Sequence, residues 1–231
     1  MEHITQNVAQ LRQKINQAAI DAGRNPAEIT FCAATKMNDT PAIRTASEAG
    51  IDCCGENRVQ ELQKKQPEGA YEGVPIHFIG HLQTNKVKFV VGNVDIIQSV
   101  DRLPLLEAIE KEAAKKDLVQ TILLEVNIGQ EESKGGFTVA ETMEISSKIT
   151  QFPHVKLVGL MAIPPISTFF GENSAFFQKM YQLFIDIRAK TYDNVTMECL
   201  SMGMSDDYVE AIANGSTMIR IGTAIFGARN Y

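Results

Sequence analysis

Long tracts of positive charge are missing from this sequence, in which lysine and arginine never cluster beyond adjacent pairs. The overall balance is acidic, with a formal net charge of -6. A basic patch or stripe is the electrostatic signature of proteins that bind nucleic acid or anionic membranes. Its absence excludes nucleic acid and the membrane surface from the expected partners. A small anionic ligand would need a local pocket instead.

Long apolar runs and a secretion signal are missing as well. No run approaches the roughly 20 apolar residues that span a bilayer, and the N-terminal stretch MEHITQNVAQ has no apolar core of the kind that signal peptides carry. The cysteines show neither C-x-x-C spacing nor a disulfide-framework pattern. We therefore expect a cytoplasmic protein whose reduced cysteines fill small spaces in the core. These are Cys32, Cys53, Cys54 and Cys199.

What the sequence does contain is a regular alternation of two kinds of segment. Eight short runs are rich in β-branched and apolar residues, and segments with helical periodicity lie between them. One helix is predicted to begin at Thr40 as N-cap, with Pro41 in its first turn, and to end at Gly50. No linker rich in proline, glycine or serine interrupts the alternation, so we expect one domain over residues 1–231. The predicted strands cover residues 30–35, 51–54, 76–80, 94–98, 120–127, 156–163, 197–200 and 217–221. Of the other predicted helices, one starts after Thr84 and stops at Gly92, three occupy 102–116, 138–150 and 174–191, and a shorter one follows Ser205.

Strands that alternate with helices in this way predict a closed (β/α)8 or TIM barrel, because parallel neighbours need crossover helices and eight such units close on themselves. An open doubly wound sheet is the alternative. Only TAIFGARNY follows the last predicted strand, which is too short for a full outer helix. A helix before the first strand, with Ile4, Val8, Leu11 and Ile15 at helical spacing, would cover the resulting gap.

Strand periodicity predicts that two basic side chains meet at one rim of the barrel. Side chains alternate along a strand, so Lys36 shares the inward face with Cys32 and Ala34, and Arg220 shares it with Gly222. The first and last strands of a barrel are neighbours, and barrel active sites lie at the carboxyl-terminal rim. Desolvation beside another cation lowers the pKa of a lysine amine, which is what makes such an amine nucleophilic. Lys36 is therefore the candidate nucleophile.

The loops after strands seven and eight usually hold phosphate in such barrels. Here they read SMGMS, residues 201–205, and GTA, residues 222–224. Glycine lets backbone amides approach an anion, and the helix after Ser205 points its first amides toward the loop. A phosphate beside a lysine predicts pyridoxal 5'-phosphate bound as a Schiff base, with Arg220 opposite the pyridine nitrogen. Taken singly, Lys36 could be a surface lysine, the residues at Ser205 a helix cap and Arg220 a partner in a structural ion pair. The joint position of these residues on one rim favours the cofactor.

Several long segments resemble the pyridoxal phosphate homeostasis protein family. They include AATKMNDTPAIRTASEAG, GENRVQE, IHFIGHLQTNKVK, LLEVNIGQEESKGGF, LVGLMAIPP and the closing LSMGMSDDYVEAIANGSTMIRIGTAIFGARNY. The resemblance implies a barrel like the N-terminal domain of alanine racemase, with Lys36 as the cofactor lysine, Arg220 at the ring nitrogen and Asn57 as a further polar contact. Met37 stands where threonine is expected, and its side chain should point away from the cofactor. The phosphate contacts implied by the same resemblance are Ser201, Gly222 and Thr223.

Other polar positions have more than one interpretation. His77 and His81 share strand parity, but two histidines without a third ligand make a weak metal site, so we expect packing at the rim. Glu125 and Asn127 also share a face, either near the cofactor or as a satisfied polar layer of the barrel. Residues 131–136 are expected to form a solvated rim loop.

Two functional classes remain open at this point. The first is a non-enzymatic, monomeric protein that carries, buffers and supplies pyridoxal phosphate in vitamin B6 homeostasis, with pyridoxal-phosphate-dependent apo-enzymes as candidate recipients. The alternative is a racemase-like enzyme that uses the same cofactor. An arginine at the ring nitrogen makes the ring a weak electron sink, and alanine racemase takes a second base, a tyrosine, from another domain. No tyrosine here falls on a predicted strand end, so we expect no enzyme activity. A Schiff-base aldolase acting on a phosphosugar is a third alternative.

Overall fold

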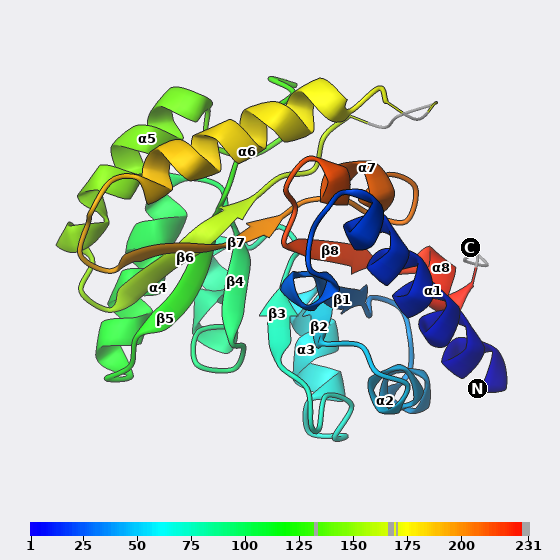
Figure 1. Cartoon of the computed structure of the whole chain (residues 1–231). Coiled ribbons are helices and arrows are strands. Elements are labelled where there is room, and N and C mark those ends of the chain that lie inside the picture. The colour runs from blue at the N-terminus through cyan, green and yellow to red at the C-terminus, as the bar shows by residue number, and fades with distance from the viewer. Residues whose placement is uncertain (132–133, 166–168, 170, 228–231) are drawn as a thin grey trace.

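The predicted strands close into one parallel barrel in the computed structural model, which describes residues 1–131, 134–165, 169 and 171–227 (Figure 1). Consecutive strands pair in parallel, and β1 closes the barrel against β8, with Cys32 opposite Arg220. The closed barrel confirms the predicted fold and excludes the open sheet. The strands are β1 (Thr30–Ala34), β2 (Cys53–Glu56), β3 (Ile76–Phe78), β4 (Ile96–Val100), β5 (Gln120–Glu125), β6 (Val155–Met161), β7 (Val195–Ser201) and β8 (Met218–Ile221).

Helices cover the outside of the barrel. Figure 1 shows α4, α5 and α6 along one flank and α1, α2 and α8 along another. The α-helices are α1 (Glu2–Asp21), α2 (Thr40–Glu48), α3 (Val59–Lys65), α4 (Leu103–Lys115), α5 (Val139–Lys148), α6 (Ser174–Arg188), α7 (Tyr208–Ala213) and α8 (Thr223–Phe226), and short 3-10 helices are η1 (Pro26–Glu28), η2 (Thr84–Phe89) and η3 (Ile149–Gln151).

The first helix fills the place of a missing outer helix, as predicted. After β8 only the four-residue helix α8 follows within the described part of the chain. Helix α1 packs against α8, α2 and α7 and buries the predicted stripe of apolar side chains. The amide of Asn7 also donates to the carbonyl oxygen of Ile225 at 2.9 Å. The seam between the first and last strands is therefore covered from the N-terminal side of the chain.

The start of α2 differs by one residue from the prediction. Asp39, rather than Thr40, is the N-cap, and its carboxylate accepts a hydrogen bond from the amide of Ala42 at 3.0 Å. The hydroxyl of Thr40 is engaged elsewhere, since it donates to the carboxylate of Glu68 at 2.5 Å. A carboxylate is a strong capping acceptor, which explains why the helix begins one residue earlier.

Three other segments were not predicted correctly. The segment after Thr84 forms the 3-10 helix η2, stabilised by bonds three residues apart such as Lys86 N–H to the Gln83 carbonyl, although Val87 is buried as expected. Helix α3 was not predicted, because its sequence VQELQKK has too few apolar residues for a clear helical period. The strand before it was predicted to end at Cys54 but continues to Glu56.

Gly55 lies in the part of β2 that extends beyond the predicted strand. Glycine usually weakens a strand, yet here a side chain would come within 2.7 Å of Cδ1 of Ile79 and 3.0 Å of Sγ of Cys32. The position needs the close backbone approach that glycine allows. As a result the polar residues that follow Gly55 reach the rim of the barrel.

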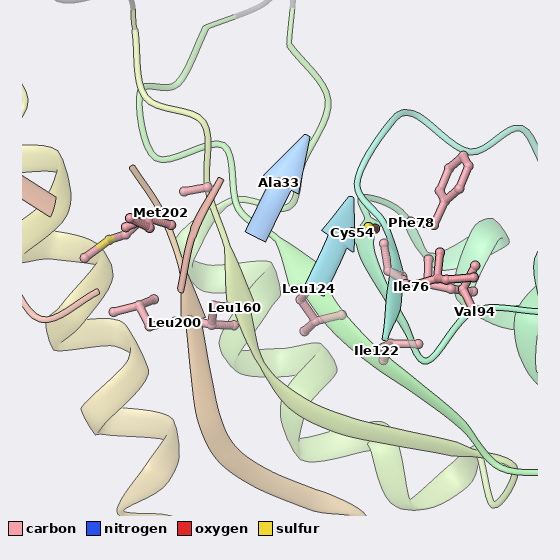
Figure 2. Close-up of a cluster of buried hydrophobic side chains, with 14 of the residues drawn as sticks. Ala33, Cys54, Ile76, Phe78, Val94, Ile122, Leu124, Leu160, Leu200 and Met202 are labelled. Atoms are coloured by element: carbon pink, nitrogen blue, oxygen red, sulfur yellow. The ribbon is translucent and has the colours of Figure 1, made fainter. Parts of the chain in front are cut away.

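The core has two layers separated by the barrel wall. The outer layer lies between strands and helices, and Figure 2 shows part of it, including Ala33, Cys54, Leu124 and Leu160. Small clusters inside the barrel consist of Cys32, Cys53 and Met218, and of Leu123, Val158 and Met161. All four cysteines are free thiols, and three of them are buried, which agrees with the predicted role as small core residues. None of the helices in the described residues is long and apolar enough to cross a membrane.

Candidate functional site

Lys36 lies in the turn that follows β1. The backbone is held on both sides of it. The amide of Thr35 donates to the carbonyl oxygen of Gly55 at 2.9 Å, and the amide of Met37 donates to the carboxylate of Glu61 at 2.6 Å. Met37 has a φ of +64°, a left-handed conformation that non-glycine residues rarely adopt and that gathers at functional sites. Met37 is 52% exposed, and the expectation that its side chain points away from the cofactor stays a prediction.

A buried ion pair lies behind this turn. Lys65 Nζ donates to Oε2 of Glu56 at 2.9 Å, to Oε2 of Glu61 at 2.6 Å and to the carbonyl oxygen of Thr35 at 3.0 Å. An ammonium group has three protons, so its donors are all used. Oε2 of Glu56 also accepts from the hydroxyl of Tyr71 at 3.0 Å, and burial together with the Glu56 charge raises the pKa of Tyr71. Sequence reasoning missed this network, although the spacing of Glu61 and Lys65 on one helix face was a usable signal.

Asn57 follows β2 directly, at the same rim. The backbone amide of Asn57 donates to Oε1 of Glu56 at 2.8 Å, so the buried ion pair also fixes the position of this residue. Its side-chain oxygen, Oδ1, is buried and has no hydrogen-bond partner among the described residues. A buried polar atom without a partner costs free energy, and a ligand group that donates to Oδ1 would remove that cost.

Arg220 projects from β8 into the barrel and is only 5% exposed. Its Nη1 donates to Oγ of Ser201 at 2.5 Å, and its Nη2 donates to the carbonyl oxygen of Ala162 at 2.9 Å. Burial lowers the pKa of Arg220, and the nearby carboxylate of Glu125 opposes that shift. The guanidinium is therefore a desolvated cation that donates one hydrogen bond to a residue of β7 and one to the residue that follows β6.

Ser201 makes the contacts of a residue that holds Arg220. Its Oγ accepts from Arg220 and donates to Oε1 of Gln98 at 2.7 Å, and the residue has no exposed surface. A hydroxyl has one proton, which is used on Gln98. In this arrangement the hydroxyl proton is directed to Gln98, and the phosphate contact expected for Ser201 stays a prediction. Gln98 was not predicted as a site residue, because nothing in its local sequence marks it.

Gly222 and Thr223 lie where β8 passes into α8. A side chain at Gly222 would come within 3.3 Å of Ala34, so this turn lies against the end of the strand that leads to Lys36. Among the described residues, the amides of Thr223 and Ala224 donate no hydrogen bond. The first amides of a helix lack partners within it and are ready donors for an anion.

Glu125 adds a carboxyl group to the interior near Arg220. Burial raises the pKa of Glu125 to about 7, Asp101 adds to that shift, and Arg220 opposes it. Asn127 has a different role from Glu125. The side-chain amide of Asn127 donates to the carbonyl oxygens of Glu131 at 2.9 Å and Lys134 at 3.2 Å. It thus holds the ends of the predicted rim loop, of which residues 132 and 133 lie outside the described part of the chain.

The two histidines of the sequence IHFIGH do not come together. His77 lies inside the barrel rather than at the rim, with its Nδ1 2.8 Å from Nε2 of Gln98, whereas His81 is exposed and lies 3.2 Å from a carboxylate oxygen of Asp101. Asp101 is in turn paired with Arg102. Across the described residues, no group of three or more histidine, cysteine, aspartate or glutamate side chains is arranged to hold a metal ion.

Comparisons with known proteins agree with the fold. The sequence profile of the family "Alanine racemase, N-terminal domain" matches residues 1–230, which places the chain in that class of barrel proteins. A curated protein of Aquifex aeolicus (strain VF5), the pyridoxal phosphate homeostasis protein, is 38% identical over 226 residues, or 98% of each chain. The protein of the same name from Escherichia coli (strain K12) is 39% identical over 234 residues, covering 100% of this chain and 99% of its own. The chain belongs to the pyridoxal phosphate homeostasis protein family.

Solved structures show the same relationship. PipY of Synechococcus elongatus PCC7942, in a structure with PLP bound, is 30% identical with a TM-score of 0.83, and the match covers 97% of this chain and 100% of that one. Alanine racemase of Clostridium difficile 630 is 14% identical with a TM-score of 0.73, over 98% of this chain and 58% of the racemase. The second match shows a shared fold alone.

Proposed function

We propose that this protein binds pyridoxal 5'-phosphate and acts as a non-enzymatic carrier that buffers the cofactor and supplies it to apo-enzymes. The names of its relatives and the bound ligand of PipY support the ligand class. The observation within this chain that carries the proposal is the position of Gly222 against Ala34. Amides suited to a phosphate therefore adjoin the strand end that leads to a lysine, and the cofactor has both a phosphate and an aldehyde.

The residues present fit this cofactor. Lys36 would hold the aldehyde as a Schiff base, the Thr223 amide and hydroxyl with the Gly222 turn would hold the phosphate, and Arg220 would face the pyridine nitrogen. Oδ1 of Asn57 supports this fit independently, because it is buried without a hydrogen-bond partner among the described residues and could accept one from a ligand at no further cost. When bound, the cofactor would supply an electrophilic aldehyde and an electron-withdrawing ring.

Ser201 has an indirect part in this proposal. Its hydroxyl proton is donated to Gln98 and its oxygen accepts from Arg220, so it would act on the cofactor by holding the arginine.

The lysine of the buried ion pair would support the backbone near Lys36 rather than bind the cofactor. Lys65 has used its three donors on Glu56, Glu61 and the Thr35 carbonyl, which disfavours it as the amine that binds the aldehyde.

The racemase-like alternative needs an acid on the second face of the substrate, and the tyrosines are poorly suited to supply one. Tyr71 donates to Glu56 from a buried position, and Tyr208 is buried in α7. Tyr181 lies on the outer surface of α6, where its ring adjoins Gly215. Tyr192 lies in the connection between α6 and β7, and Tyr231 lies outside the described residues. These positions favour a carrier over a racemase-like enzyme. The proposed carrier acts as a single barrel unit over residues 1–231, in monomeric form in the cytoplasm.

Absorption spectroscopy followed by chemical trapping tests the proposal. The purified protein with added pyridoxal phosphate should absorb as a Schiff base, and borohydride reduction should fix the adduct on the peptide that contains Lys36. Lys36→Ala should give no adduct at that peptide. An adduct on Lys65 would refute the assignment of the lysine, and a colourless protein that does not bind the cofactor would favour the phosphosugar aldolase.

A further inference from the structure

A chain of polar side chains crosses the interior of the barrel, starting at Arg220. Oγ of Ser201 lies 2.5 Å from Nη1 of Arg220 and 2.7 Å from Oε1 of Gln98. Nε2 of Gln98 lies 2.8 Å from Nδ1 of His77. The four residues come from β8, β7, β4 and β3, and none is more than 5% exposed. Buried polar groups are costly unless they are paired, and here each one is paired with the next.

The direction of these hydrogen bonds follows from Arg220. A guanidinium group can only donate, so Oγ of Ser201 accepts from it and gives its own proton to Oε1 of Gln98. The amide nitrogen of Gln98 then faces His77 and donates to Nδ1. The proton of the neutral imidazole therefore lies on Nε2. Burial lowers the pKa of His77 to about 4, which keeps the ring neutral.

We propose that Gln98 and His77 are positioning residues that set the orientation of Arg220 through the hydroxyl of Ser201. The inference rests on the proposed function, since it concerns the contact between Arg220 and the pyridine nitrogen of the cofactor. Without Gln98, the Ser201 hydroxyl would lose its acceptor and would turn toward another one. Arg220 would then keep only its hydrogen bond to the Ala162 carbonyl oxygen. A guanidinium group held by a single hydrogen bond can rotate about that bond.

A pair of ligands isolates this contact. Pyridoxal phosphate and its 1-deaza analogue, in which carbon replaces the ring nitrogen, differ only where Arg220 is expected to bind. The wild type should bind pyridoxal phosphate more tightly than the analogue. Gln98→Leu should reduce that preference by about tenfold, the size expected when a charged hydrogen bond is lost. Arg220→Lys should also reduce it, because a lysine cannot reproduce the two-point anchoring.

Ser99→Ala provides a matched control on the same strand. Ser99 is the next residue of β4 and is 1% exposed, and its hydroxyl has no hydrogen-bond partner among the described residues. The substitution should leave the ligand preference unchanged. A Gln98→Leu variant that folds and keeps the full preference of the wild type would overturn the inference, and so would an equal loss in Ser99→Ala.

Histidine NMR gives a second readout that needs no cofactor. It can be measured even if the Gln98→Leu variant does not fold. In the wild type, nitrogen-15 spectra should show His77 neutral with its proton on Nε2. In Gln98→Glu, a carboxylate can accept from both Ser201 and His77, so the proton should move to Nδ1 while the ligand preference is kept. A wild-type His77 protonated on Nδ1 would refute the bond directions. A wild type that binds neither ligand would refute the proposed function while the NMR result still stood.

Discussion

Lys65 Nζ lies 2.9 Å from Oε2 of Glu56, and the two side chains are 7% and 0% exposed. The same ammonium group contacts the carbonyl oxygen that precedes Lys36, and the same carboxylate contacts the amide of Asn57. One buried ion pair therefore connects the ends of β1 and β2. It holds the backbone beside two residues that are proposed to touch the cofactor.

Replacing Lys65 with methionine should lower the free energy of unfolding by about 3–5 kcal/mol, because the Glu56 carboxylate would remain buried without its partner. Urea denaturation measures the change. Lys148→Met is the control, since Lys148 pairs with Glu144 on the exposed face of α5, where such pairs contribute little. Similar losses in both variants would contradict the structural role of the buried pair.

Alanine substitutions at Thr223 and at Ser201 should change the affinities for phosphorylated and unphosphorylated ligand differently. Thr223→Ala removes a hydroxyl donor and should weaken pyridoxal phosphate about tenfold while leaving unphosphorylated pyridoxal nearly unaffected. Ser201→Ala should weaken both ligands to a similar degree, because it acts through Arg220. Isothermal titration with the two ligands distinguishes the cases. If Ser201→Ala affected only the phosphorylated ligand, the direct phosphate contact implied by the sequence would be restored.

Glu125 should make stability depend on pH. Its pKa is raised from 4.5 to about 7, first by burial and then by Asp101, so the folded protein holds a proton that the unfolded chain releases. Its contribution to stability is complete below pH 4.5 and is lost as the pH rises to about 7. The wild type should therefore lose up to about 3 kcal/mol relative to Glu125→Gln between these limits. Parallel denaturation curves at every pH would show that the carboxyl group titrates normally.

Amino acids should not exchange their Cα protons at a significant rate. One barrel can present Lys36, but racemisation also needs an acid on the opposite face, and each such group typically contributes 10²–10⁴-fold. The test is deuterium incorporation into L- and D-amino acids, with Lys36→Ala as the control. Rapid exchange that depends on Lys36 would replace the carrier with a racemase-like enzyme.

The alternation of strands and helices could be predicted from the sequence because it depends on local periodicity. Apolar residues at spacings of two and of three to four gave the barrel, and strand parity placed Arg220 on the inner face of the last strand. The predictions failed where local signals were weak or tertiary contacts overrode them. Helix α3 has few apolar residues, and the cap of α2 moved to Asp39 because Thr40 is bound to Glu68.

The sequence by itself determined the barrel and the proposed positions of Lys36, Gly222 and Thr223, since strand ends and turns carry local marks in the residues that form them. Only the tertiary structure decided which side chains Ser201 contacts. Its partner Gln98 lies 103 positions away in the chain, and the two meet because barrel closure brings the inner faces of β4 and β7 together. Local sequence cannot specify such a meeting, because the hydrogen bonds of a buried side chain depend on the register of every strand between them.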